Sequence, residues 1–184
     1  MKRRMILIGL IVIVICAAWM VYKTFPRSID VTLTGVKYQL SAEGAKAGTE
    51  PATVVIQGKL YTSLKGEHTF KGVVSIVGEQ IPVPLDQRKL EIHFASEGWG
   101  VMAYPYIHYN QRGAVEGVDI YNSHILFANK HFSQVTLLLS TPQKVWNSDN
   151  GYMISAPAST REEALTMSNN LMRKFLALYG MSLQ

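Results

Sequence analysis

The chain has 184 residues, a formal net charge of +5 and an isoelectric point of about 9.3. Three of its 18 basic residues lie in residues 1–4, and all 13 acidic residues lie beyond residue 23. The remainder therefore carries 15 − 13 = +2 charges with the two signs interspersed, which argues against a nucleic-acid partner. The single cysteine, Cys16, lies in an apolar stretch, so the rest of the chain has neither a disulfide nor a thiol nucleophile.

Residues 5–22 are almost entirely apolar and uncharged. A helix of that length would span roughly 27 Å, close to the hydrocarbon thickness of a bilayer. Basic residues precede this stretch, which predicts a cytoplasmic amino terminus. The sequence thus predicts a cytoplasmic tail (1–4), a transmembrane signal anchor (5–22), a linker (23–28) and an extracytoplasmic domain (29–184), with the membrane as a partner through residues 5–22.

Two alternatives for this segment are a cleaved signal peptide and a lipoprotein signal. Small residues around Ala17 could precede a cleavage site. However, the apolar stretch continues through Trp19 to Tyr22, whose rings suit a membrane interface. The lipoprotein alternative would use Cys16, but Ile15 stands where a small residue is needed. These features favour the anchor.

The domain that follows shows alternating apolar and polar residues, which is typical of half-buried strands. Short segments containing glycine, proline or asparagine separate the alternating stretches. The predicted strands cover residues 29–40, 53–64, 68–77, 89–95, 101–109, 118–128 and 135–140. Their spacing predicts an antiparallel β-rich domain, either a sandwich or a strongly bent sheet.

The last part of the chain changes to a helical period. Apolar residues recur every three, four or seven positions from Leu165 to Tyr179, after a capping box that begins near Ser159. Gly180 is a suitable end. This pattern predicts an amphipathic helix over residues 160–179, and hence an α+β fold class in which that helix covers one face of the sheet.

No residue pattern predicts a catalytic, cofactor-binding or metal site. The five histidines lack the spacing of a zinc motif, and the chain has no nucleophile elbow and no phosphate-binding glycine loop. We therefore predict that the protein is not an enzyme. The alternative is a hydrolase or metal-dependent enzyme that uses histidines with Glu91 or Glu97, since His93 and His108 could meet across neighbouring strands.

The densest aromatic segment runs from Trp99 to Tyr109. In a strand, Tyr104, Tyr106 and His108 would project from one face. With Trp99 they form a candidate interaction surface for an envelope protein or a glycan, because tyrosine offers contact area at a low entropic cost. The alternative is that this face packs under a loop or under the terminal helix.

Two short segments carry a family resemblance: Phe70–Ile76 (FKGVVSI), and Ile154–Ala158 (ISAPA) leading into Arg161–Ala164 (REEA). They resemble uncharacterised membrane-anchored exported proteins of Gram-positive, spore-forming bacteria. The resemblance implies no catalytic residues. Together these features predict a single-pass, membrane-anchored extracytoplasmic binding or accessory protein of the cell envelope; the alternatives are the exported enzyme and a cleaved, secreted binding protein.

Overall fold

The computed structural model describes residues 2–140 and 146–184, with side chains described from residue 9 onward in the first helix. The side chains of the predicted cytoplasmic tail, residues 1–4, therefore lie outside the described part of the structure. The elements are α1 (Lys2–Thr24), β1 (Arg27–Gln39), α2 (Ala42–Ala47), β2 (Thr49–Thr62), β3 (His68–Ile76), the 3₁₀ turn η1 (Leu85–Gln87), β4 (Leu90–Phe94), β5 (Trp99–Tyr109), β6 (Val115–Ala128), β7 (Val135–Leu138), β8 (Tyr152–Ala156), α3 (Arg161–Leu171) and α4 (Arg173–Tyr179).

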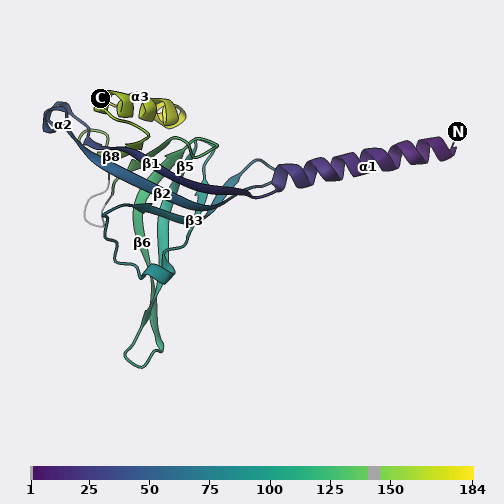
Figure 1. Ribbon diagram of the computed structural model, residues 1–184, viewed down its shortest axis with the longest axis horizontal. Helices are drawn as coiled ribbons and strands as arrows, with labels where there is room; N and C mark the ends of the chain where they lie inside the picture. The colour runs from purple at the N-terminus through teal and green to yellow at the C-terminus, as the bar shows by residue number, and fades with distance from the viewer. Residues whose placement is uncertain (1, 141–145) are drawn as a thin grey trace.

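The first helix, α1, projects away from the β-sheet (Figure 1). Among the described residues, no helix is both long and apolar enough to cross a membrane. This finding contradicts the predicted signal anchor over residues 5–22, the transmembrane helix in the predicted fold class, and the single-pass membrane location.

The strands form one antiparallel sheet in the order β4-β3-β2-β1-β8-β7-β6-β5. The two strands at the ends of this order, β4 and β5, follow each other in the chain and lie against one another. A tight turn joins them, in which the Ala95 amide donates to the Trp99 carbonyl at 2.8 Å. The sheet therefore curls until its ends meet, and the predicted alternative of two stacked sheets is wrong.

Glycines on facing strands permit this curvature. Gly58 of β2 lies opposite Gly72 of β3, and the ring of Phe70 lies across both. A β-carbon on either glycine would come within 2.8 Å of the Phe70 Cζ atom. Because glycine in a strand often marks such a close approach, the pair lets the sheet bend around a large aromatic side chain.

The concave side of the sheet encloses an inner core. Alternate residues of β2, namely Val54, Ile56 and Leu60, point into it and are buried. Phe70, Ile92, Tyr104, Leu126, Phe132 and Leu137 complete its central part. The alternation is the sequence pattern of a strand with one buried face.

An outer core lies between the convex side of the sheet and the C-terminal helices, where α3 covers β1, β7 and β8 (Figure 1). The predicted capping box is present: Thr160 accepts from the Glu163 amide at 3.2 Å, and Glu163 accepts from the Ser159 amide at 2.8 Å. The predicted single helix over 160–179 is wrong, since Met172 separates α3 from α4. The Asn169 side chain holds the C-terminal segment against α3, because it donates to the Leu183 carbonyl at 3.2 Å and accepts from the Leu183 amide at 2.9 Å.

Two elements were not predicted. β8 is buried over Met153–Ala156, so it shows no alternation that would identify it as a strand. α2 lies in the connection between the predicted strands at residues 29–40 and 53–64, where Ser41 caps it by accepting from the Gly44 amide at 3.1 Å. Both form because of contacts with β1, which a local pattern does not contain.

Candidate ligand-binding recess

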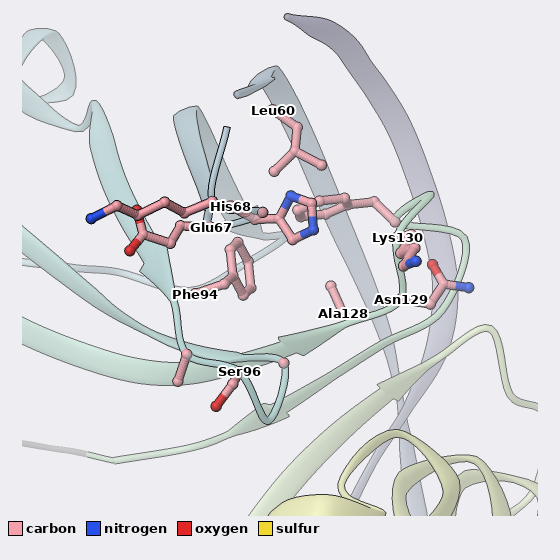
Figure 2. Close-up of a pocket in the computed structure, with 13 residues that line it drawn as sticks. Leu60, Glu67, His68, Phe94, Ser96, Ala128, Asn129 and Lys130 are labelled. Atoms are coloured by element: carbon pink, nitrogen blue, oxygen red, sulfur yellow. The ribbon is translucent and has the colours of Figure 1, made fainter. Parts of the chain in front are cut away.

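A hollow of about 440 Å³ opens at one end of the curled sheet, and we call it the recess. The turns β2–β3, β4–β5 and β6–β7 surround it, because these three connections all lie at the same end of their strands. Figure 2 shows the His68 ring, Phe94 and Ala128 pointing toward the hollow from different strands and turns. The volume lies in the range of about 300–1,000 Å³ that is common for small-molecule sites.

The floor of the recess is apolar and aromatic. It consists of Leu60, Phe94, Ala128 and Phe132. The Phe132 ring lies 5.4 Å from that of Phe70 and 5.8 Å from that of Phe94, the second contact being edge-on. Such tilted and edge-on pairs are favourable aromatic geometries. The floor is thus a continuation of the inner core that reaches solvent.

The β6–β7 turn holds Phe132 in place. Its backbone has a φ of 54°, in the left-handed region that bulky residues rarely adopt. The Asn129 side chain stabilises this turn by accepting from the amides of His131 and Ser133, at 3.3 and 3.0 Å. The strained backbone of this turn therefore positions an aromatic ring at the bottom of the recess.

The rim of the recess is basic. Arg27, at the start of β1, donates from its guanidinium to the Lys130 carbonyl at 2.6 Å, which ties β1 to the β6–β7 turn. Lys65, His68 and Lys130 line the opening, with Glu67 as the acidic member. The Glu67 carboxylate accepts from the Ser63 hydroxyl at 3.2 Å.

His68 is the titratable group closest to the floor. Its Nδ1 atom lies 3.1 Å from the Thr62 hydroxyl. Burial lowers the pKa of the imidazole below its ordinary value of 6.5, and the positive charges of Lys130 and Arg27 lower it further. His68 is therefore mostly neutral at pH 7, because burial and the neighbouring positive charges both oppose its protonation.

A second hollow, of about 1,010 Å³, lies on the other side of this basic group, beside α1. Arg27, Thr62, His68 and Lys130 line it together with apolar residues of α1 such as Val14 and Val21. His68 and Lys130 belong to the walls of both hollows. The basic rim thus stands between two apolar spaces.

The four residues predicted as an interaction surface do not share one exposed face. Tyr104 is only 2% exposed, and its hydroxyl donates to the Val74 carbonyl at 3.2 Å. Trp99 packs on the other side of the sheet, with its ring 6.3 Å from that of Phe175. Tyr104 and Trp99 therefore belong to the inner and outer cores, respectively.

The other two predicted residues lie further along β5. The rings of Tyr106 and His108 stack edge-on at 4.7 Å. His108 Nε2 lies 2.9 Å from a carboxylate oxygen of Asp119 on β6. Of the four predicted residues His108 is exposed, whereas Tyr106 is partly buried and packs against the inner core. Both lie on the β5–β6 hairpin, which extends beyond the rest of the sheet (Figure 1).

The histidines and carboxylates of the enzymatic alternative have separate partners. His93 contacts Thr69 and Glu91, at 3.2 and 3.4 Å, rather than meeting His108. Glu97 accepts from the adjacent Ser96 hydroxyl at 2.7 Å. Within residues 2–140 and 146–184, no group of three or more His, Cys, Asp and Glu side chains could hold a metal ion.

The shortest histidine–carboxylate contact among the described residues joins His124 to the partly exposed Glu79, whose Nε2 and Oε1 atoms are 2.6 Å apart. His124 is only 4% exposed. Its other ring nitrogen, Nδ1, accepts from the Ser140 amide at 3.3 Å, so Nε2 carries the proton that is donated to Glu79. Both nitrogens are engaged, and the pair fastens the segment after β3 to β6.

Sequence reasoning missed the recess residues His68, Phe94, Lys130 and Phe132. Each lies in or beside a turn, where local polarity indicates only a connection. Their proximity depends on the sheet curling until β4 meets β5. The signal that could have drawn attention to this end was the Phe132 ring inside a short turn of polar residues.

Comparison with protein-family models, with curated proteins and with solved structures found no match to this chain. The resemblance carried by Phe70–Ile76 and Ile154–Ala158 stays a prediction. The geometry of the recess is therefore the main basis for a functional hypothesis.

Proposed function

We propose that this protein binds a small ligand with an apolar body in the recess at the open end of its curled sheet. The observation that carries the proposal is the recess itself, a hollow of about 440 Å³ with an aromatic floor and a polar rim. Ligand sites commonly combine a concave apolar surface with a few convergent polar groups. Stable burial of Phe132 and Phe70 beneath the recess supplies a rigid base for such a ligand.

The floor is suited to binding because its aromatic rings are already ordered. Phe94 and Phe132 are fixed by their mutual contact, and Phe132 also by its turn. A ligand that covers the floor removes apolar area from water, at about 25 cal/mol per Å². It orders few side chains in doing so, which keeps the entropic cost of binding low.

The proposal is tested with Nile red, a neutral apolar dye whose fluorescence rises in apolar surroundings. The variant Ala128→Trp would fill the recess, because the Ala128 side chain points into it (Figure 2). We expect this variant to lose saturable binding of the dye. Ala45→Trp adds the same volume on the exposed side of α2 and should bind like the unmodified chain.

Ser96→Trp is a second blocking variant, since Ser96 is exposed and lies at the rim. It keeps the test decisive if Ala128→Trp fails to fold, which circular dichroism would reveal. Equal dye binding by folded Ser96→Trp and Ala45→Trp would contradict the proposal. So would the absence of saturable binding by the unmodified chain.

A further inference from the structure

We infer that the ligand of the recess is an amphipathic anion, with an apolar chain on the aromatic floor and a negatively charged head group at Arg27, His68 and Lys130. We infer also that its binding is coupled to proton uptake by His68. This inference rests on the proposed function and adds the chemical class of the ligand and the regulation of the site. The juxtaposition of a basic rim and an apolar floor carries it.

The charges around the recess favour an anion. Lys65 and Lys130 line the recess, and Arg27 and Lys23 line the adjoining hollow beside α1, where Arg27 donates to the Lys130 carbonyl. Among the described residues that line the recess, Glu67 is the one acidic side chain, and its carboxylate already accepts from the Ser63 hydroxyl. A neutral ligand would leave this excess of positive charge uncompensated, whereas a head group with several oxygens could accept from guanidinium, ammonium and imidazole donors.

The position of the basic group explains why the ligand needs an apolar chain as well. His68 and Lys130 line both the recess and the hollow beside α1. A head group held there has an aromatic floor on one side and apolar residues of α1, including Val14 and Val21, on the other. A free inorganic anion would use neither surface.

His68 couples this arrangement to pH. The groups that face it are Thr62 on β2, Phe94 on β4, Arg27 on β1, Lys130 in the β6–β7 turn, Lys65 and Glu67 in the β2–β3 turn, and Lys23 at the end of α1. Without a ligand, its surroundings oppose the charged imidazole and depress its pKa. An anion beside the ring reverses that balance and favours protonation.

The sign of the effect follows by linkage. Because the anionic complex holds more protons on His68 than the free protein, the affinity for the anion rises as pH falls through the titration range of the imidazole. The affinity for an uncharged analogue has no such dependence on this group. Comparing the anion with its uncharged analogue therefore separates the contribution of the head group to the affinity from that of the apolar chain.

The experiment is displacement of Nile red from the full chain by decyl sulfate, with decanol as the uncharged analogue of equal chain length. Decyl sulfate stays anionic throughout, so a change in pH acts only on the protein. We expect decyl sulfate to bind at least about tenfold more tightly than decanol. Between about pH 7.5 and about pH 5.5, its affinity should rise about threefold or more while that of decanol stays constant.

Matched variants locate the effect. His68→Gln should remove the pH dependence and keep decanol binding, whereas His131→Gln, in the exposed part of the β6–β7 turn, should change neither. Lys130→Gln should weaken decyl sulfate about threefold to tenfold without weakening decanol. Lys46→Gln removes the same charge on α2 and should have no effect.

Two further ligands define the class. Inorganic sulfate should not displace the dye, and decyltrimethylammonium should bind more weakly than decanol. If inorganic sulfate displaced the dye, the inference that the ligand needs an apolar chain would be wrong. If decyl sulfate and decanol bound with equal affinity, the inference that the ligand carries an anionic head group would be wrong. In either case Nile red still binds, so the proposed function stands; absence of dye binding would instead overturn both.

Discussion

The inner and outer cores of this protein are both apolar, but the outer core is closed by buried polar groups and the inner core opens into the recess. The outer core, beneath α3, is closed by four hydroxyl groups that contact one another, from Tyr38, Thr136, Ser155 and Ser168. Their oxygens are 2.6–3.3 Å apart, and all four residues are at most 1% exposed. The inner core instead ends in the recess, where Phe94 is partly exposed above the buried Phe132 and beneath a basic rim.

This difference separates a structural region from a candidate functional one. The four hydroxyls of the outer core satisfy each other, so they fix the position of α3 on the sheet and none of them lacks a partner. In the recess, apolar area and positive charge are left uncovered, which lowers stability unless something binds there. Substitutions in the outer core should therefore alter stability, and substitutions in the recess should alter binding.

The largest expected effect comes from a large-to-small substitution in each region. Phe127 is fully buried in the outer core, with its ring 5.4 Å from that of Phe175. Phe127→Ala should lower the free energy of unfolding by about 3–5 kcal/mol. Phe132→Ala should cost less, because that side chain already borders a hollow, but it should weaken Nile red binding. Denaturant unfolding would measure the stability of each variant, and dye titration its affinity for Nile red. If the two variants lost equal stability and Phe132→Ala bound the dye like the unmodified chain, the proposed difference between the two cores would be wrong.

The hydroxyl cluster should show a smaller effect. Ser168 contacts each of the other three hydroxyls, at 2.6–3.0 Å. Ser168→Ala would leave buried partners unsatisfied and should lower the free energy of unfolding by about 1–3 kcal/mol. Ser182→Ala, on an exposed serine, should change it by less than about 0.5 kcal/mol. A loss below that limit in Ser168→Ala would mean that the cluster does not hold α3.

The two regions also differ in what the sequence reveals about them. The capping box at Ser159–Glu163 and the end at Gly180 are local patterns, and both are confirmed. Alternation identified most strands because each has one buried face. Closure of the sheet depends on its curvature, which the close approach of Gly58 and Gly72 to Phe70 permits and which a local period does not show.

The site was harder to predict than the strands for the same reason. Tyr104 was predicted on an exposed aromatic face, but curling turns that face of β5 toward the inner core. Phe94, Lys130 and Phe132 come together only after the sheet has closed. A sequence period shows which residues share a face, but not whether that face is concave.

Alkaline unfolding should report on both cores. Burial raises the pKa values of Tyr38 in the outer core and Tyr104 in the inner core above the ordinary value of 10.0. The unfolded chain therefore loses these protons first, and stability should fall as pH rises above about 10. Tyr104→Phe should reduce this slope in pH-dependent denaturant unfolding. An unchanged slope would show that Tyr104 does not contribute to it.

The smallest expected effect is the part of the acid-induced loss of stability that comes from His68 in the recess. The pKa of His68 is lowered from 6.5 by burial and by Lys130 and Arg27, so the unfolded chain binds its proton first. The stability contributed by neutral His68 is complete above about pH 6.5 and is lost as pH falls through the depressed pKa of the folded state. His68→Gln should flatten the stability profile in this range, measured against His131→Gln. Identical profiles for the two variants would contradict the placement of His68 among those charges.

The central claim, that the open end of the sheet is the ligand site, is tested most directly by mapping backbone amide shifts in the NMR spectrum during addition of decyl sulfate. We predict saturable shifts at residues 66–68, 94–98 and 128–132, and constant positions around Tyr38, Ser155 and Ser168. Shifts confined to the β5–β6 hairpin, or equal shifts at the recess and the hydroxyl cluster, would contradict it.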